Sequence, residues 1–405
     1  MSATQAPAGP LRTPAGLPRL PRLPRQTLLP RQRAEEQSER KQQALAVGAF
    51  LLSAQFPGQG HAEALDRTVS TTVAAELAGL DSVWLAEHHF VPYGTCPSAT
   101  TLAALLLGRT RQIRVGTAVS VLPTQHPVAL GEQAALLHLT SGGRFTLGVG
   151  RGGPWIDLDV FDAGLEAFEH GFPESLDLLL RWLRSSRVGA EGARYRFPEV
   201  PVVPRATETP TPQRFADTLA EGHDGRRVGG GPPVIVACTS LGSVRLAAQR
   251  GLPMLLGMHA DDEEKAGMVA AYRAAALEAG RTPDQVERVE AQHVSAGVAQ
   301  VEDGSATAAR RRLLRTMPGF FQYGLAAHRT VDGRERRMRD PQAYTELLCD
   351  LHPVGTARTC ADRLAATAER TGIRRFALLV EGSGDREATL ENVRRLGGEV
   401  LPQLS

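Results

Sequence analysis

Short apolar runs alternate with longer segments of helical periodicity along most of the chain, and this alternation limits the fold more than any other feature. Eight runs have the length and apolar content of buried strands, at 46–52, 82–86, 113–118, 144–149, 234–237, 253–256, 294–298 and 376–380. Segments typical of helices follow them, at 62–79, 98–108, 127–139, 172–185, 242–250, 262–279, 304–315, 358–371 and 386–398. Strands that alternate with helices form parallel sheets, and eight such units predict a closed (β/α)8 barrel, or TIM barrel, over residues 44–405.

Three stretches depart from this repeat. Residues 187–232 are rich in Pro, Gly, Arg and Thr, and residues 317–352 separate the seventh strand from the eighth. Long segments of this kind are typical of lids and flexible loops, so both are expected to be insertions in the barrel. Residues 1–43 repeat Leu-Pro-Arg four times, and proline at this density predicts a disordered tail. A basic docking arm is the alternative for this tail.

Composition excludes several classes of protein. No apolar run reaches the ~20 residues of a membrane-spanning helix. The chain has 46 Lys and Arg against 44 Asp and Glu, so it lacks the basic excess that is typical of nucleic-acid-binding proteins. The four cysteines show no CxxC spacing, which argues against a zinc ribbon or a disulfide scaffold and suits a reducing cytosol.

A barrel of this kind carries its chemistry where the strands end, so the residues after each strand predict the site. The second strand is followed by His88 and His89, and the fourth by a glycine-rich turn that contains Arg151. Adjacent residues of a strand point to opposite sides, so one histidine is expected to face the barrel mouth. The HxH spacing of a metal pair is absent. The glycine-rich turn follows the wrong strand for a dinucleotide fingerprint.

Hydroxyl side chains open the helix that follows the fifth strand. Thr239, Ser240 and Ser243 lie where free backbone N–H groups and the positive end of the helix dipole favour an anion. A plain helix cap is the alternative, and it accounts for one of the three. Together with Arg151, these residues predict a site for an aromatic ligand that carries a phosphate.

The same stretches resemble the bacterial luciferase-like family of flavin-dependent monooxygenases, close to the luciferase catalytic subunit. The similarity is carried, in order along the chain, by residues 81–90, 115–118 with 121–128, 141–152, 247–254 and 353–356. The resemblance implies a barrel that binds reduced FMN. In this family, oxygen adds to the flavin and forms a C4a-peroxide, which oxidises a small organic substrate such as an aldehyde, a ketone or a natural-product intermediate.

The resemblance also implies roles for individual residues. His88 matches the catalytic histidine, and a pKa near neutrality would suit it to proton transfer. Ala118 and Val119 match a cis peptide that lies under the flavin ring. The other expected cofactor-binding residues are Phe50, Gly150 and Asp157 near the ring, and Arg151, Thr239, Ser240 and Ser243 at the phosphate.

Partners follow from the same resemblance. A separate NAD(P)H:flavin reductase is expected to supply reduced flavin. A homodimer is expected through the helices at 98–108 and 127–139, with His126 of one chain meeting Glu132 of the other. The segment 317–352 is expected to close over the mouth and exclude water.

Some residues depart from the luciferase pattern. Gly150 replaces a reactive cysteine, Pro154 a tyrosine, Thr239 a glutamate and His170 an arginine. These changes argue against light emission and a long-chain aldehyde substrate. Three alternatives stay open: an oxidoreductase that uses the deazaflavin coenzyme F420, a non-catalytic flavin-binding subunit, and a metal-dependent hydrolase, which the missing HxH spacing disfavours.

Overall fold

Eight parallel strands close into a barrel in the computed structural model, which describes residues 44–208, 231–334 and 339–404. Each strand pairs with its neighbour in the chain, and the last pairs with the first, from Ala46 opposite Arg375 to Phe50 opposite Leu379. The barrel strands are β1 (Ala46–Leu51), β2 (Ser82–Leu85), β3 (Arg114–Thr117), β5 (Phe145–Gly150), β8 (Val234–Cys238), β9 (Met254–Leu256), β10 (Val294–Val298) and β13 (Arg375–Leu379). The predicted (β/α)8 barrel is confirmed.

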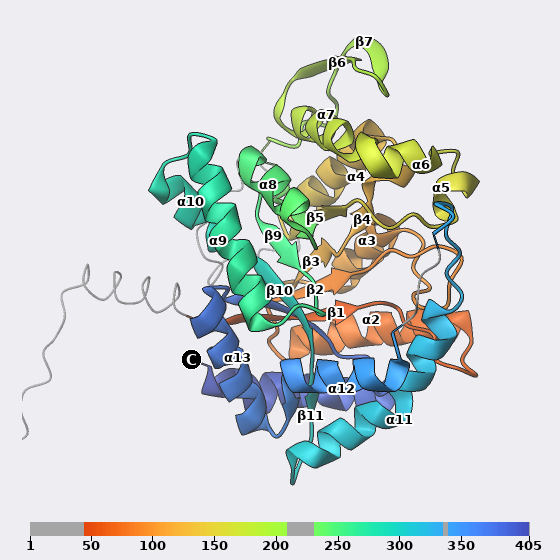
Figure 1. Cartoon of the computed structure of the whole chain (residues 1–405), viewed down its shortest axis with the longest axis vertical. Coiled ribbons are helices and arrows are strands. Elements are labelled where there is room, and N and C mark those ends of the chain that lie inside the picture. The colour runs from red at the N-terminus through yellow and green to blue at the C-terminus, as the bar shows by residue number, and fades with distance from the viewer. Residues whose placement is uncertain (1–43, 209–230, 335–338, 405) are drawn as a thin grey trace, which may run out of the picture. The chain divides into compact units, whose positions relative to one another are not determined.

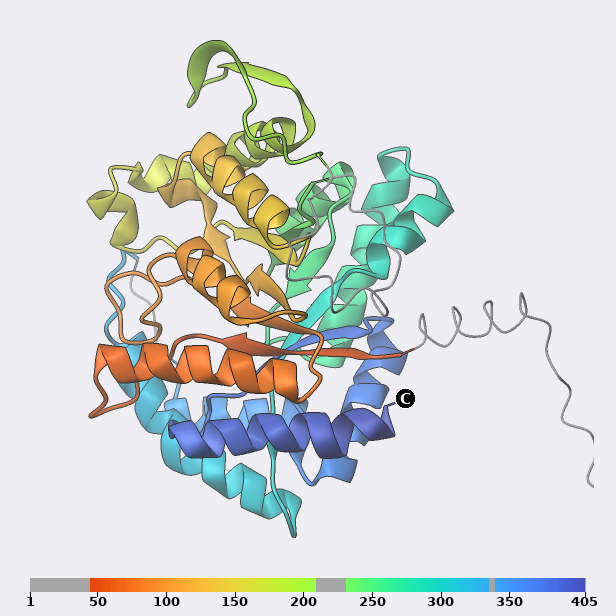
Figure 2. The ribbon, with the colours of Figure 1, turned by 180° about the vertical axis from the view of Figure 1, so that it is seen from behind.

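Helices surround these strands (Figure 1). The long ones are α2 (His61–Leu77), α3 (Ala99–Arg109), α4 (Pro127–Thr140), α7 (Phe172–Arg184), α8 (Leu241–Arg250), α9 (Asp262–Glu278), α11 (Ala306–Leu325), α12 (Pro341–Leu351), α13 (Ala357–Thr371) and α14 (Arg386–Arg395). Shorter elements are β4 (Ser120–Val121), η1 (Leu122–Thr124), α5 (Asp157–Val160), α6 (Gly164–Glu166), η2 (Ala167–Gly171), α10 (Pro283–Glu290), β11 (Gln300–Val301), β12 (Val354–Gly355), η3 (Leu396–Val400) and η4 (Leu401–Gln403). Figure 2 shows α2 beside α14, as closure of the ring requires.

The strands are buried on both faces, as parallel strands between helices must be. On β1, Ala49 and Leu51 belong to the core between the strands and the outer helices, whereas Phe50 belongs to a second core inside the barrel. This alternation follows the two-residue period of a strand. Phe50 therefore points toward the barrel axis, near the end of β1 where a ligand enters.

The segment 317–352 is more helical than the sequence analysis predicted. Helix α11 continues to Leu325 and contains Pro318, and α12 follows and packs against it. Phe320 and Phe321 of α11 are almost fully buried. Their burial offsets the backbone hydrogen bond that Pro318 removes, so the helix does not end there. The prediction that an irregular insertion begins at residue 317 is wrong.

The segment 187–232 begins with an ordered hairpin. Strands β6 (Arg187–Glu191) and β7 (Arg196–Pro201) pair antiparallel, and Figure 1 shows the hairpin extending beyond α7. Val188 and Ala190 pack against Trp182 of α7, which holds the hairpin in place. The prediction of an irregular loop is therefore wrong for residues 187–201. The rest of this insertion from residue 209 to 230, and the tail 1–43, lie outside the described residues.

A helix that the sequence analysis missed, α10, begins with a clear signal. The Thr282 hydroxyl accepts a hydrogen bond from the Gln285 amide, the Gln285 side chain accepts one from the Thr282 amide, and Pro283 occupies the first turn. This capping box is readable from the sequence. Within the described residues, no helix combines the length and apolar character needed to cross a bilayer.

A buried ion pair joins the first strand unit to the last. The Arg67 guanidinium of α2 lies 3.6 Å from the Glu381 carboxylate, which follows β13, and both side chains are fully buried. Glu381 also accepts a hydrogen bond from the Leu52 amide at 2.7 Å, and Arg67 donates to the carbonyls of Ala54 and Gly384. These contacts hold together the loops that follow β1 and β13, where the barrel closes.

Replacing Glu381 by alanine is expected to destabilise the chain by about 3–5 kcal/mol, because it leaves the Arg67 charge buried and unpaired. Urea unfolding measures the change. The control is Glu387→Ala, which removes a largely exposed carboxylate that pairs with Arg386 and is expected to cost less than about 1 kcal/mol. Equal losses in the two variants would show that the buried pair has no special role.

Candidate active site

The predicted site residues follow neighbouring strands and therefore meet at one end of the barrel. In the pairing of β5 with β8, Val149 lies opposite Val236, and a Cβ added to Gly150 would lie 3.5 Å from the Cβ of Ala237. The register brings Arg151 and Thr239, which follow these two strands, to the same edge of the barrel. The structure thus places Arg151 near the hydroxyl-rich start of α8.

A shelf of small and apolar groups lines this end of the barrel. The peptide bond between Ala118 and Val119 is cis, as the resemblance implies, and both residues are half-buried against the inner core that contains Phe50. A Cβ at Gly150 would lie only 2.5 Å from Cγ2 of Val119, so this position requires glycine unless Val119 moves. A side chain at residue 150 would therefore displace the shelf.

Trp84 of β2 belongs to the inner core of the barrel and is buried. A Cβ at Gly116 would lie 2.6 Å from the Trp84 ring, so glycine at this position lets the indole lie flat against β3. The indole N–H donates to the hydroxyl of Ser82 at 3.0 Å, which fixes the orientation of the ring. Glycine at 116 and 150 therefore lets Trp84 and Val119 pack closely inside the barrel.

His88 is held in a dry setting. Its backbone N–H donates to the carbonyl of Cys96 at 3.0 Å, and its ring meets the Tyr93 ring edge-on with 5.0 Å between centroids. Nδ1 is buried without a hydrogen-bond partner, and a Cβ at Gly94 would lie 2.5 Å from it. Burial, followed by the nearby His328 and His89, lowers the pKa of His88 to about 3. The imidazole is therefore neutral near pH 7.

His89 points to different partners, as adjacent positions at a strand end predict. Its Nε2 lies 3.9 Å from the Glu87 carboxylate, and its ring meets Phe161 edge-on at 4.9 Å. Burial raises the pKa of Asp157, whereas His89 acts to lower it, so Asp157 lies on the His89 side. The structure thus gathers Asp157 with His89, and His88 with a separate group of rings.

Glu87 is a structural residue that the sequence analysis did not single out. Its carboxylate is buried and accepts hydrogen bonds from the backbone N–H groups of Ala99 at 3.1 Å and Val121 at 2.9 Å. It also accepts one from the Gln125 side chain. Glu87 therefore ties the end of β2 to the first turn of α3 and to β4. An acidic residue directly after a buried strand was the signal available in the sequence.

The start of α8 has the hydrogen bonds of a helix cap. Ser240 caps the helix, and its side chain accepts from the Ser243 amide, while the Ser243 hydroxyl accepts from the amides of Thr239 and Ser240 at 3.2 Å. The capping alternative is thus confirmed for Ser240 and Ser243. Thr239 is exposed, and a Cβ at Gly242 would meet no atom closer than 3.8 Å, so the helix start stays open to an anion.

Arg151 lies exposed beside this helix start. Its guanidinium lies over the Phe168 ring, 4.2 Å from the ring centroid. A cation held by an aromatic face keeps its charge and its N–H donors available. Arg151 therefore has the chemistry expected of a phosphate-binding residue.

The segment after α11 adds aromatic groups that the sequence analysis missed. The ring of His328 lies 4.7 Å from Trp155 and 5.9 Å from Tyr93, which itself contacts His88. Backbone hydrogen bonds join Ile156 to Arg329 and Val331 to Pro154, each at 2.9 Å. Residues 328–331 are therefore hydrogen-bonded to the loop that follows β5. Through His328 they also join the group of rings around His88. In the sequence analysis, only the expectation that the segment 317–352 closes over the barrel mouth suggested a role for these residues.

One of the two predicted dimer residues, His126, has contacts within the chain. His126 caps α4 through Nδ1, which accepts from the Val128 amide at 3.2 Å, and its ring meets Tyr195 of the hairpin at 5.0 Å. Glu132 is exposed on α4. The expected contact between His126 and Glu132 of two chains stays a prediction.

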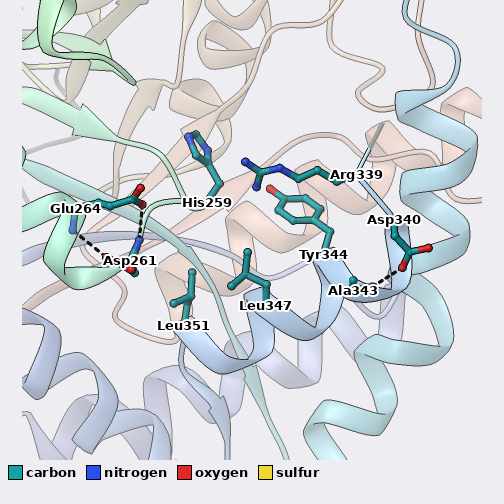
Figure 3. Close-up of a pocket in the computed structure, with 9 residues that line it drawn as sticks. All are labelled: His259, Asp261, Glu264, Arg339, Asp340, Ala343, Tyr344, Leu347 and Leu351. Atoms are coloured by element: carbon teal, nitrogen blue, oxygen red, sulfur yellow. Dashed lines mark hydrogen bonds between the residues drawn. The ribbon is translucent and has the colours of Figure 1, made fainter. Parts of the chain in front are cut away.

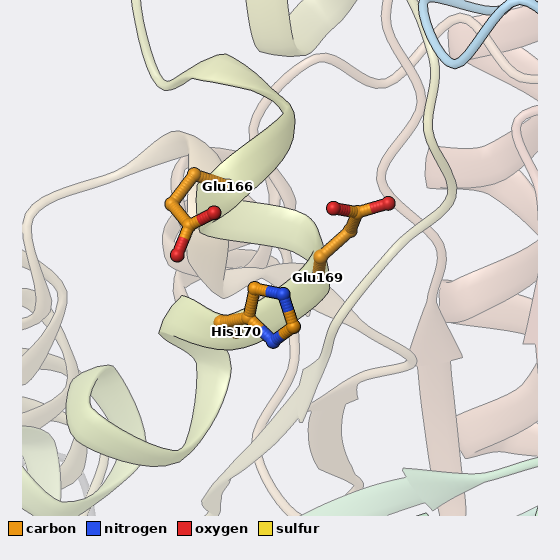
Figure 4. A group of neighbouring side chains, drawn as sticks. All are labelled: Glu166, Glu169 and His170. Atoms are coloured by element: carbon orange, nitrogen blue, oxygen red, sulfur yellow. The ribbon is translucent and has the colours of Figure 1, made fainter.

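One cluster of side chains has the residue types of a metal site. Among the described residues, three side chains come close enough to share a metal ion: Glu166, Glu169 and His170, which follow one another along α6 and η2 (Figure 4). All three are exposed. Exposed carboxylates are well solvated on their own, so this group by itself does not indicate a metal site.

Comparisons with known proteins agree with this geometry. Residues 45–375 match the family model described as luciferase-like monooxygenase. The alkanal monooxygenase alpha chain of the Kryptophanaron alfredi symbiont is 27% identical over 378 residues, which cover 89% of this chain and 98% of the relative.

Solved structures share the fold. Monooxygenase RslO1 from Streptomyces bottropensis superposes with a TM-score of 0.70 at 23% identity, covering 89% of this chain and all of that one. The oxygenating constituent of 3,6-diketocamphane monooxygenase from Pseudomonas putida, solved with FMN, gives 0.67 at 21%, covering 89% and 98%. An F420-dependent secondary alcohol dehydrogenase gives 0.63 at 16%, covering 89% and 99%. The family match spans most of the barrel, and the chain belongs to the luciferase-like monooxygenases.

Proposed function

We propose that this chain is a monooxygenase that uses reduced FMN and molecular oxygen to oxidise a small organic substrate. The observation that carries the proposal is the shelf at the barrel mouth, where the half-buried cis peptide of Ala118 and Val119 packs against Gly150. The open start of α8 lies at the neighbouring strand end. A flat ring joined to a phosphate fits this arrangement.

Different residues would contact the ring and the phosphate of the flavin. Phe50, Ala118, Val119 and Gly150 would contact the ring, with Asp157 on the side of His89. Arg151, Thr239, Ser240 and the first amides of α8 would hold the phosphate, and Ser243 would keep the helix start in shape. Once bound, reduced flavin supplies the electrons that activate oxygen.

His88 would act as a neutral hydrogen-bonding group. Nδ1 is sealed against Gly94 and has no acceptor, so a proton there would be buried without a partner, at a cost of about 1–3 kcal/mol. The favoured tautomer therefore carries its proton on Nε2. From this position His88 would donate a hydrogen bond to an oxygen atom of the bound reactants and stay neutral.

Dry surroundings support oxygen chemistry. Tyr93 meets the ring of His88, and His328 contacts both Tyr93 and Trp155. Burial and the neighbouring Tyr344 raise the pKa of Tyr93, so its hydroxyl stays protonated. Excluding water protects reactive intermediates from side reactions.

Partners form part of the proposal. We expect a separate NAD(P)H:flavin reductase to deliver reduced FMN, and a homodimer through α3 and α4. Leu105 of α3 and Leu136 of α4 support the dimer, because they are 45% and 54% exposed on these two helices. The cysteines at 96, 238, 349 and 360 are buried and unpaired, which supports a cytosolic setting.

An F420-dependent oxidoreductase is the second candidate, supported by the shared fold of the F420-dependent dehydrogenase. Oxygen uptake distinguishes the two. The purified chain is supplied with a flavin reductase, NADH, FMN and a panel of aldehydes, ketones and aromatic compounds. Substrate-dependent incorporation of one ¹⁸O atom from labelled oxygen supports the proposal, whereas turnover only with reduced F420 and without oxygen overturns it. Binding of FMN without turnover of any compound would favour a non-catalytic subunit.

His88→Ala is expected to lower turnover by about 10²–10³, the usual cost of removing a preorganised hydrogen-bond donor, with FMN affinity nearly unchanged. His88→Gln serves as the matched variant, since its amide N–H can take the place of the Nε2 proton. It is expected to retain more activity than alanine. Equal activity of the alanine variant and the parent would move the role to another residue.

Arg151→Ala is expected to weaken FMN binding about ten-fold or more, the range of a charge-assisted hydrogen bond. Riboflavin lacks the phosphate and is expected to bind both proteins equally, as measured by quenching of flavin fluorescence. Arg311→Ala, which removes an exposed arginine of α11, is the control for loss of charge. A matching loss of riboflavin affinity would assign Arg151 a structural role.

The pKa of His88 gives a separate test that needs no cofactor. Because its pKa is lowered to about 3, the ring is expected to stay neutral as the pH falls from about 8 to 5, while an ordinary histidine titrates near 6.5. NMR of ¹³C-labelled histidine, with the His88→Gln variant for assignment, measures the ring signal. A midpoint near 6.5 would contradict the sealed setting of the ring.

A further inference from the structure

A groove of about 520 Å³ opens between the loop after β9 and helix α12, and no residue of the predicted site lines it. Figure 3 shows its lining residues, which are His259, Asp261, Glu264, Arg339, Asp340, Ala343, Tyr344, Leu347 and Leu351. This volume is within the range of small-molecule sites. The loop after a barrel strand supplies one wall, so the groove lies at the catalytic end of the barrel.

Hydrogen-bond donors meet at one end of this groove. The Arg339 guanidinium lies 5.5 Å from the centroid of the Tyr344 ring, and Figure 3 shows it pointing toward His259. Burial, followed by the charge of Arg339, lowers the pKa of His259, so this ring is a neutral partner. Across the ranges that the structure describes, no carboxylate forms an ion pair with Arg339. Its charge is available to a ligand.

The carboxylates of the groove accept hydrogen bonds from backbone amides. The Asp261 carboxylate accepts from the Glu264 amide at 2.8 Å, and the Glu264 carboxylate accepts from the Asp261 amide at 3.2 Å. Asp340 accepts from the Ala343 amide at 2.7 Å. Figure 3 shows Asp261 and Glu264 on the far side of His259 from Arg339. One end of the groove therefore attracts an anion, and the other end repels a second one.

Aromatic contacts connect this groove to His88. Tyr344 lies 4.9 Å from Phe321, and Phe320, the next ring along α11, lies 5.3 Å from Tyr93. Tyr93 in turn meets His88 at 5.0 Å. The side chains that wall the groove and those that wall His88 thus belong to one continuous group of rings.

We propose that this groove binds the carboxylate of an organic monoacid substrate, with Arg339 as the residue that recognises the charge. Tyr344 and His259 would donate further hydrogen bonds, and Leu347 and Leu351 would contact the apolar part of the acid. The inference rests on the proposed function, since it names the class of substrate that the monooxygenase takes. Repulsion by Asp261 and Glu264 disfavours a diacid of similar length.

Calorimetric titration of the full chain without flavin tests the groove by itself. The probes are 4-phenylbutanoate and its primary amide, which share shape but differ in charge. The acid is expected to bind about ten-fold more tightly or better, since a charge-assisted bond to arginine is lost with the amide. Arg339→Gln is expected to abolish this preference. Arg311→Gln removes an equivalent exposed charge on α11 and is expected to preserve it.

Several results would overturn the inference: equal binding of acid and amide, a preference that survives in Arg339→Gln, or no binding of either probe at millimolar concentration. Thermal melting of Arg339→Gln checks that the variant folds, which is expected because Arg339 is exposed. The two proposals fail separately. An acid preference without oxygen uptake would retain the groove and overturn the monooxygenase, and oxygen uptake without an acid preference would do the reverse.

Discussion

The buried ion pair of Arg67 and Glu381 is the constraint on which the catalytic end of the barrel depends. Strand pairing closes the ring through β1 and β13, but the loops beyond these strands have no ladder to hold them. Burial raises the pKa of Glu381, while Arg67 and the backbone amides act to lower it. A carboxylate in this position is retained only with those partners in place. The pair therefore fixes the chain on both sides of Phe50, which points inside the barrel from the end of β1.

Glycines, which have no side chain, shape the site as much as the larger residues do. Glycine at 94, 116 and 150 lets His88, Trp84 and Val119 occupy space that a Cβ would take. Each contact would be closer than 3.0 Å with any other residue at that position. The consequence for His88 is chemical, because the close approach of Gly94 seals Nδ1 and leaves Nε2 as the working atom. For Val119 it is geometric, because the shelf stays flat only while residue 150 has no side chain.

Periodicity made the barrel predictable, and long-range packing made the rest unpredictable. All eight strands were found because parallel strands are continuous apolar runs, and the hydroxyl-rich start of α8 was found because helix caps are local. The end of helix α11 was predicted too early in the chain. Burial of Phe320 and Phe321 carries the helix past Pro318, and these two residues are recognised as core only once their packing partners are known. Burial is the main cause of the lowered pKa of His88, and His328, which is 240 residues away in the chain, lowers it further. Glu87 and the capping box of α10 were local signals and were overlooked.

Two arginines of the catalytic end differ from the arginines that form ion pairs. Arg250, Arg273 and Arg310 pair with carboxylates, which neutralise them. Arg151 and Arg339 lie instead over the rings of Phe168 and Tyr344. A ring orients a planar guanidinium without consuming its N–H donors or its charge, and lysine has no planar group to stack in the same way. This ring contact, after β5 for Arg151 and before α12 for Arg339, leaves both guanidinium groups able to bind anions at separate places around the barrel mouth. That separation is what a phosphate-bearing cofactor and an acidic substrate would need in order to bind together without competing for one charge.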